Sequence, residues 1–280
     1  MLFKRLNRYK NKKYSQKNKF QNNCGKGRII MKNKSLKEIK ELVKQGDLDA
    51  MCELAYRKFE GEGIEQDYKG AFELYNQASE KGSIKATYNL GNSYYYGEGI
   101  EQDLNEAFKL YEKASSKEND NATYMLAICY YFGNGVDKNF NKAFNLFSIL
   151  AEKGQEDAEY YLSTMYYDGE GTEKNLKKSF EYMKKSAEKG YEKAYFWTGY
   201  KYLQGEGTEV NDKEAIKWLE KSVEVNDDMG QWLLGTLYLE GNENGIKIEK
   251  NTKYGLELLK KSAKQGNEKA KEELKRLKQL

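Results

Sequence analysis

The sequence predicts an all-α solenoid built from about six antiparallel helix pairs. Its 280 residues contain no proline, which suits a mainly helical chain with short turns. A unit of 36 residues recurs along the chain, in the segments LGNSYYYGEG, LAICYYFGNG, LSTMYYDGEG and TGYKYLQGEG. A fixed period of this size is typical of stacked units that are each too small to bury their own apolar face. Because such arrays present long surfaces, the period also favours a binding function.

The composition excludes several classes of site. The chain has no histidine, which removes triads with a histidine base, histidine-ligated zinc and histidine pH switches. Its three cysteines, Cys24, Cys52 and Cys129, show no paired spacing, which argues against disulfides and zinc and favours a reducing compartment. No apolar run approaches the roughly 18 residues that a membrane span needs. We therefore expect a monomeric cytoplasmic protein with no metal and no other cofactor.

Residues 1–33 are expected to form a basic disordered tail, because they carry no apolar periodicity. Residues 1–36 contain 12 Lys and Arg and no Asp or Glu, whereas the remainder contains 36 basic and 44 acidic residues, a net charge of −8. The tail could bind nucleic acid or an anionic membrane, with Tyr9, Tyr14 and Phe20 adding stacking or anchoring. It could also be a solvated extension without a role.

A third interpretation, which we favour, is that translation starts at Met31. The preceding Lys26-Gly27-Arg28 can be encoded by AAA-GGA-AGG, a purine run that resembles a bacterial ribosome-binding site. Mass spectrometry of the native N-terminus tests this hypothesis, and a peptide that spans Arg28 to Lys34 would exclude it.

Each unit is expected to open with a helix that begins at a small residue and ends at a glycine pair. The small residues are Ala50, Ala86, Ala122, Ala158, Ala194 and Gly230. The glycine pairs are Gly61/Gly63, Gly97/Gly99, Gly133/Gly135, Gly169/Gly171 and Gly205/Gly207. Glycine just past a helix supplies the left-handed turn that other residues resist, so we interpret each pair as a helix end. A phosphate-binding loop is the alternative, but such a loop occurs once and follows a strand.

A second helix follows, and an Asp or Asn six residues after the first glycine is expected to cap it. These structural caps are Asp67, Asp103, Asn139, Asn175, Asn211 and, in the last unit, Asn251. A scattered metal site is the alternative, but recurrence every 36 residues is what helix starts require. The helices themselves read AFELYNQAS, AFKLYEKAS and AFNLFSILA, with apolar residues at helical spacing and polar ones between.

The combined pattern resembles the Sel1-like repeat, a relative of the tetratricopeptide repeat. It reads small-x-x-x-Leu-Gly-x-x-Tyr-x-x-Gly-x-Gly, then Asp/Asn-x-x-x-Ala, then Lys-Ala-Ala-x-x-Gly, and we place the repeat domain at residues 34–280. Residues 35–46 resemble a lone second helix that caps the N-terminal end, and the segment from Ala270 resembles a closing first helix. The resemblance implies a right-handed superhelix that holds a protein or peptide partner in its concave groove.

Two positions of the first helix are expected to line this groove, counting from the small residue as position 1. Position 3 holds Tyr88, Tyr124, Tyr160, Phe196 and Trp232, and position 10 holds Tyr95, Tyr131, Tyr167, Leu203 and Leu239. Tyr and Trp are the residues that dominate binding hot spots. The alternative is packing between neighbouring units, and rings that are more than about nine-tenths buried cannot line a groove.

The predicted function is therefore a non-enzymatic scaffold or adaptor for a protein or peptide partner. One alternative is a carboxylate-dependent hydrolase of the repeat family, with paired carboxylates in the groove. That activity needs a set of catalytic residues that occurs only once in the chain, and the repeat pattern contains no such set. The other alternative is binding of nucleic acid or membrane, and it rests on the basic tail alone.

Overall fold

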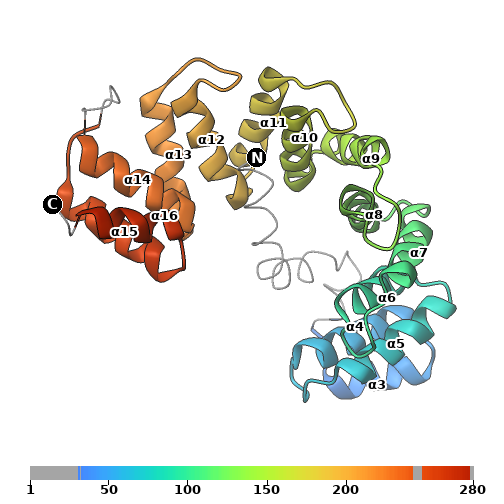
Figure 1. The fold of residues 1–280 in the computed structure, drawn as a ribbon. Helices are drawn as coiled ribbons and strands as arrows, with labels where there is room; N and C mark the ends of the chain where they lie inside the picture. The colour runs from blue at the N-terminus through green and yellow to red at the C-terminus, as the bar shows by residue number, and fades with distance from the viewer. Residues whose placement is uncertain (1–30, 32, 242–247, 278–280) are drawn as a thin grey trace. The chain divides into compact units, whose positions relative to one another are not determined.

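The computed structural model describes residues 31, 33–241 and 248–277. The predictions about the basic tail, including Tyr9, Tyr14 and Phe20, fall outside the described residues. The described part of the chain contains fourteen helices and no strand (Figure 1). The predicted all-α solenoid of helix pairs is confirmed.

Twelve of these helices alternate along the chain as six first helices and six second helices. The first helices are α4 (Leu48–Glu60), α6 (Ile84–Tyr96), α8 (Asp120–Phe132), α10 (Glu156–Asp168), α12 (Glu192–Gln204) and α14 (Asp228–Glu240). The second helices are α5 (Tyr68–Glu80), α7 (Leu104–Ser115), α9 (Phe140–Glu152), α11 (Leu176–Glu188), α13 (Asp212–Glu224) and α15 (Thr252–Lys264). Single helices flank the pairs at either end, α3 (Leu36–Lys44) and α16 (Glu268–Leu277).

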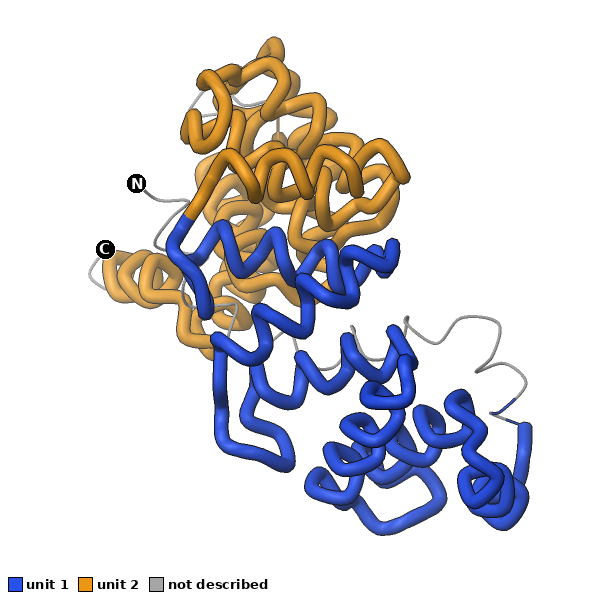
Figure 2. Tube along the Cα trace, turned by 90° about the vertical axis from the view of Figure 1, so that its right-hand side faces the viewer, with its two compact units in different colours: residues 1–138 blue, residues 139–280 orange. Residues whose placement is uncertain are grey.

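The chain divides into two compact units, residues 1–138 and 139–280 (Figure 2). In the first unit each described helix from α3 to α8 packs on the next one in the chain. In the second unit the same holds from α9 to α16. This succession of neighbours is the arrangement that stacked helix pairs produce.

The first helices begin two residues earlier than predicted. In α6, for example, Ser83 is the N-cap, and the backbone N–H of Ala86 donates to its hydroxyl at 3.2 Å. Ala86 is therefore the third residue of the helix, because a side-chain cap satisfies the donors of the first turn. Asp47, Asn119 and Asp227 cap their helices in the same way.

The second helices begin at the Asp and Asn residues selected from the sequence. Each of the six side chains accepts a hydrogen bond from a backbone N–H of the first turn. The donors are Gly70 for Asp67, Asn105 and Glu106 for Asp103, Lys142 for Asn139, Lys178 for Asn175, Glu214 for Asn211 and Tyr254 for Asn251.

The two glycines of each pair have different roles. The first glycine ends its helix, as at Gly97, where φ is 73° and the N–H donates to Ser93 O. The second also has positive φ, but a Cβ on Gly207 would collide with the carbonyl oxygen of Leu176, the first residue of the preceding second helix. Gly99, Gly135 and Gly171 make the same approach to Tyr68, Leu104 and Phe140. The prediction that both glycines only end the helix was therefore incomplete, since the second allows neighbouring repeats to meet.

The N-terminal end is closed by α3. Ser35 caps this helix in a capping box: its N–H donates to Glu38 Oε2 at 2.8 Å, and the Glu38 N–H donates to Ser35 Oγ. Ile39 of α3 is buried in a cluster with Met31, Ala50 and Leu54. A short helix of this kind covers the apolar side that the first repeat would otherwise expose.

None of the described helices combines the length and the hydropathy needed to cross a lipid bilayer.

Candidate partner-binding face

The aromatic residues predicted to line the groove are mostly buried. Five of the rings are each at most 8% exposed, namely Tyr88, Tyr124, Tyr131, Tyr160 and Phe196. They pack within the chain: the Tyr160 ring lies 5.3 Å from that of Tyr191, and the Tyr88 ring lies 6.1 Å from that of Tyr111. The groove prediction is wrong for these five rings, because positions 3 and 10 point toward neighbouring helices rather than toward open solvent.

Tyr95 and Tyr167 at position 10 are half-buried, and their hydroxyls bind the next repeat. The Asn134 side chain donates to Tyr95 Oη at 2.7 Å, and Tyr167 Oη donates to Glu206 Oε1 at 3.3 Å. Asn134 and Glu206 each lie between the two glycines of a pair, and each follows its tyrosine by 39 residues. These two hydrogen bonds therefore link one repeat to the next.

Trp232, the last aromatic residue at position 3, is half-buried beside the closing helix. The ammonium nitrogen of Lys269 in α16 lies 4.1 Å from the centre of its ring. Burial at this contact lowers the pKa of Lys269. A cation over the face of an indole is a favourable arrangement, so Trp232 helps to hold the closing helix.

The first repeat lacks the tyrosine hydroxyl that the second, third and fourth repeats have at position 10. Phe59 lies 39 residues before Glu98. This is the separation of Tyr95 from Asn134 and of Tyr167 from Glu206, but phenylalanine has no hydroxyl to form the bond. Glu98 Oε2 is buried without a hydrogen-bond partner among the described residues. Burial, followed by the negative charge of Glu60, raises the pKa of Glu98 to about 7. A carboxyl group that lacks its donor is thus held partly protonated near neutral pH.

We predict that Phe59→Tyr lowers the pKa of Glu98 and stabilises the chain above pH 7 by about 1 kcal/mol. Because the folded pKa is raised, Glu98 contributes stability that is present at acidic pH and lost as the pH rises toward 7. Urea unfolding at pH 5 and pH 8 measures this loss, which the added hydroxyl should reduce. Glu98→Gln is the control and should remove this part of the pH dependence. An unchanged difference between the two pH values in Phe59→Tyr would contradict the prediction.

In α12 the face that packing leaves open lies at positions 4, 7 and 11. In α12, Gly199 at position 6 faces Leu219 of its own second helix, and Thr198 and Tyr202 at positions 5 and 9 contact the preceding one. At 100° per residue, positions 4, 7 and 11 lie on the opposite side. We call these positions the open face.

The open face is most accessible in the second unit. In α12 it consists of Trp197, Tyr200 and Gln204, none of which is buried, and in α14 of Leu233, Thr236 and Glu240, all half-buried. In α6, α8 and α10 the residues at positions 4 and 7 are buried, namely Asn89, Asn92, Met125, Ile128, Tyr161 and Thr164. Accessible aromatic surface at these open-face positions is thus concentrated on α12.

Three rings of α12 form one cluster. Trp197 lies 5.0 Å from Phe196 and 6.0 Å from Tyr200 between ring centres, both with edge-to-face geometry. Phe196 is buried, and its ring centre lies 6.0 Å from that of Tyr200, so Phe196 packs against both of the other rings. The open face of α12 therefore carries two accessible aromatic rings, Trp197 and Tyr200, that pack on the buried ring of Phe196.

A buried lysine lies beside this cluster. Lys201 is 1% exposed at position 8, where the first unit has the buried Arg57 and the other units have Ser93, Cys129, Met165 and Leu237. Its ammonium nitrogen lies 3.6 Å from Glu206 Oε2 and 4.5 Å from the centre of the Tyr167 ring. Burial lowers the pKa of Lys201, while Glu206 and Asp168 oppose that shift.

The prediction that the pattern contains no non-repeating constellation did not consider this charged group. A comparison of position 8 across the units could have revealed it, because Arg57 and Lys201 stand where the other four units have small or apolar residues. The lysine is closed to solvent, so no substrate reaches its amine in this arrangement. It acts as part of the packing between the fourth and fifth repeats.

We predict that Lys201→Met stabilises the chain by about 1 kcal/mol at neutral pH. Met165 fills the same position of the preceding repeat with no exposed surface. Because burial lowers the lysine pKa, its charged form costs stability below that pKa, and the cost disappears as the pH rises toward 10.5. The gain measured by urea unfolding should therefore shrink at high pH. A loss of stability at pH 7 would show instead that the ion pair stabilises the fold.

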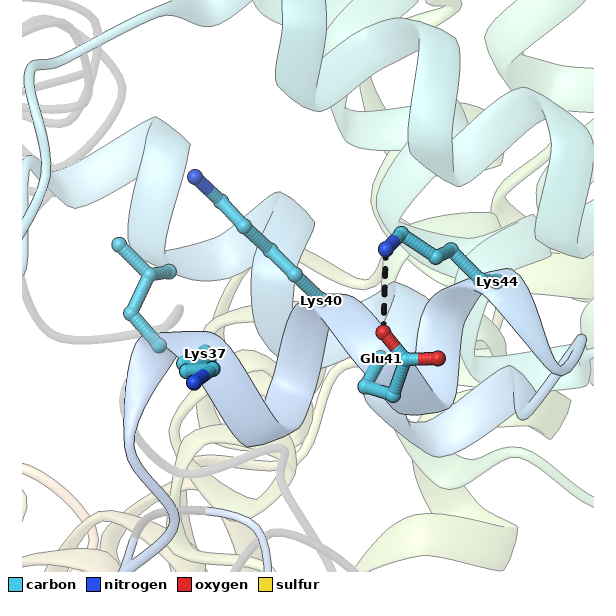
Figure 3. Close-up of a pocket in the computed structure, with 5 residues that line it drawn as sticks. Lys37, Lys40, Glu41 and Lys44 are labelled. Carbon is cyan, nitrogen blue, oxygen red and sulfur yellow. Dashed lines mark hydrogen bonds and ion pairs between the residues drawn. The ribbon is translucent and has the colours of Figure 1, made fainter.

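A hollow of about 550 Å³ also lies on α3, lined by Leu36, Lys37, Lys40, Glu41 and Lys44 (Figure 3). All of these side chains come from one helix, and Lys44 donates to Glu41 at 3.0 Å. Surface ion pairs of this kind contribute little, and no aromatic ring lines the hollow. It is a weaker candidate than the open face. Within the described ranges, no group of three Cys, Asp or Glu side chains is placed to hold a metal ion.

Comparison with known proteins agrees with this division into repeats. The family model of the Sel1 repeat matches six segments, residues 48–83, 84–119, 120–155, 156–191, 192–227 and 228–267. Each segment contains one first helix and one second helix. A search of the curated proteins found no match.

Two solved structures are similar over most of the chain. One is a protective antigen of uropathogenic Escherichia coli strains that displays an SLR fold, with 32% identity, a TM-score of 0.76, and coverage of 85% of this chain and 50% of that one. The other is a Sel1 repeat protein from Oxalobacter formigenes, with 25% identity, a TM-score of 0.72, and coverage of 78% and 88%. The chain thus spans half the length of the E. coli protein.

Proposed function

Because the chain belongs to the Sel1 repeat family, we propose that it is a scaffold that binds a protein or peptide partner on the open face of α12 and α14. The observation that carries this proposal is the accessible aromatic pair Trp197 and Tyr200 on α12. Tryptophan and tyrosine dominate the binding energy of protein interfaces, and both rings here are supported from below. Leu233 of α14 extends the apolar surface at the same open-face position as Trp197.

The outer sides of the second helices offer a poor alternative. In α13 the exposed residues include Lys213, Lys217 and Glu220, and Lys217 pairs with Glu214 at 3.1 Å. Exposed pairs at helical spacing are well hydrated and contribute little to affinity. A partner gains more from covering the aromatic face than from displacing water around these charges.

We propose no catalytic role and a location in the cytoplasm. The side chain of Lys201 is closed to solvent, which supports a structural task. Cys52 and Cys129 are buried and are not bonded to each other, which fits a reducing compartment. Burial raises the pKa of Cys129 to about 12, so this thiol is not a nucleophile at neutral pH.

Photo-cross-linking tests the proposed function. A benzophenone amino acid is placed at Tyr200 or Leu233 on the open face, or at Lys217 on the outer side of α13 as the matched control. After irradiation in lysate of the source organism, we expect a discrete adduct from the open-face sites and not from the control. Equal adducts from all three sites, or none from the open face, would contradict the proposal.

A further inference from the structure

Two asparagine amides occupy the open-face positions of α6. Asn89 lies at position 4 and Asn92 at position 7, and these residues are only 8% and 3% exposed. Buried polar side chains in proteins are almost always hydrogen-bonded. The Asn89 amide is an exception, because neither its oxygen nor its nitrogen has a hydrogen-bond partner among the described residues, and neither atom is closed to solvent.

Tyr111 fixes the orientation of the second amide. Its hydroxyl donates to Asn92 Oδ1 at 2.8 Å, and Tyr111 itself has no exposed surface. Burial raises the pKa of Tyr111 well above its usual value, so the hydroxyl remains a donor. Because Oδ1 is the atom that accepts, Asn92 Nδ2 is directed away from Tyr111 and presents its two N–H donors. No described residue accepts from Nδ2, and this atom is not closed to solvent either.

Other repeats satisfy the polar groups at these two positions within the chain. Glu53 at position 4 of α4 accepts from Arg57 Nε at 2.9 Å. Thr164 and Thr236 at position 7 of α10 and α14 each donate to the carbonyl oxygen four residues earlier. The unpaired amide groups of α6 are therefore a property of this repeat and not a requirement of the fold.

We infer that Asn89 and Asn92 bind the main chain of an extended partner peptide. A carboxamide carries an acceptor oxygen and N–H donors, which are the groups that pair with the N–H and C=O of a peptide unit. Side chains three residues apart on a helix have Cβ atoms about 5 to 6 Å apart. Equivalent groups of an extended chain recur every second residue, at about 6.6 Å. The two amides therefore match alternate peptide units of one extended segment.

The surroundings of the amides favour an uncharged ligand. Neither amide carries a charge, and the same positions of α8 hold the apolar residues Met125 and Ile128. A phosphate or an ionic side chain gains no ion pair from these four residues, whereas a peptide backbone gains hydrogen bonds. The inference rests on the proposed function, and it states how the partner is recognised in the first unit.

Peptide selection with the full chain supplies the probe. A library of random peptides displayed on phage is first depleted on the variant Asn89→Leu and then selected on the wild type. Enriched peptides are synthesised with a fluorescein label, and their affinity is measured by fluorescence anisotropy. We expect Asn89→Leu to weaken these peptides about fivefold or more, which corresponds to about 1 kcal/mol, the contribution of one hydrogen bond.

Two further variants locate the binding. Asn92→Asp keeps an acceptor for Tyr111 but removes the amide donors, and it should also weaken the peptides about fivefold or more. Asn105→Ala is the matched control, because it removes an exposed amide from α7, and it should change affinity less than about twofold. Circular dichroism shows whether each variant remains folded, and Asn92→Asp still decides the matter if Asn89→Leu does not fold.

Stability distinguishes a binding role of Asn89 from a structural one. Because its amide has no partner in the described part of the chain, Asn89→Leu should leave the midpoint of urea unfolding unchanged or raise it. A side chain that is retained for binding loses function on such a change without losing stability. A lower midpoint in Asn89→Leu would assign the amide to the fold and overturn the inference.

Modified peptides test whether the main chain is what the amides bind. Methylation of single backbone nitrogens removes one donor at a time, and at one or two positions it should weaken binding about tenfold or more. Replacement of the side chain by alanine at the same positions should change affinity less than about threefold.

Several further results would overturn the inference. They are no enrichment of peptides over Asn89→Leu, equal effects of Asn89→Leu and Asn105→Ala, or tolerance of every backbone methyl group. A benzophenone amino acid at Tyr96, one turn after Asn92, provides another test. Cross-links from it to residues 1–30 in the purified chain would assign the amides to the chain's own segment and overturn a separate partner. If adducts still form from Tyr200 while these tests fail, the scaffold proposal stands and only this inference is lost.

Discussion

Gly207→Ala should destabilise the chain by about 3 kcal/mol or more, whereas Gly63→Ala should cost about 1 kcal/mol. Both glycines have positive φ, 76° at Gly207 and 70° at Gly63, so alanine at either site is destabilised by a left-handed backbone conformation. Only Gly207 also faces a backbone: its Cβ would collide with the carbonyl oxygen of Leu176, whereas a Cβ on Gly63 meets nothing within 4 Å. The difference between the two variants isolates the cost of separating two repeats.

Urea unfolding followed by circular dichroism measures both losses. Because stacked repeats can unfold in parts, the transition should also be followed by the fluorescence of Trp218 and its neighbours in the second unit. Gly207→Ala should shift the fluorescence transition most. Equal losses in Gly207→Ala and Gly63→Ala would show that the close approach contributes nothing beyond backbone strain.

Tyr160→Ala should destabilise the chain by about 3 to 5 kcal/mol, because the ring is buried within the second unit. The side chain is 2% exposed and packs against the rings of Tyr161 and Tyr191. Removing it leaves a cavity that neighbouring helices cannot fill without moving. Tyr160→Phe is the matched control: it keeps the ring and should lose no more than about 1.5 kcal/mol.

Thermal and urea unfolding of the two variants distinguish packing from binding. A position that served mainly as binding surface would tolerate alanine with a loss below about 0.5 kcal/mol. That outcome for Tyr160→Ala would restore the original interpretation of position 3 as part of a groove. The expected large loss instead makes multiple alanine variants of this ladder unsuitable for partner assays, since they would report unfolding.

The sequence by itself determined the features that depend on neighbouring residues in the chain. Asn139 and Asn175 cap helices because a short polar side chain reaches a backbone N–H three residues away. Gly97 ends a helix because its own φ is positive. The 36-residue period followed from the repetition of these local signals, and with it the all-α fold and the six helix pairs. Only the exact starts of the first helices were misplaced, by two residues.

The tertiary structure alone decided which side of each helix remains open. Helical periodicity orders the residues around a helix, but it does not say which neighbours cover them, and so Tyr88 and Tyr160 were assigned to a groove although adjacent helices bury them. The same applies to Gly207 and Leu176, which are 31 residues apart and meet only when two repeats stack. Lys201 entered the core because Glu206 and Tyr167 lie beside it in space. Contacts between repeats are long-range in the chain, and no local signal specifies their geometry.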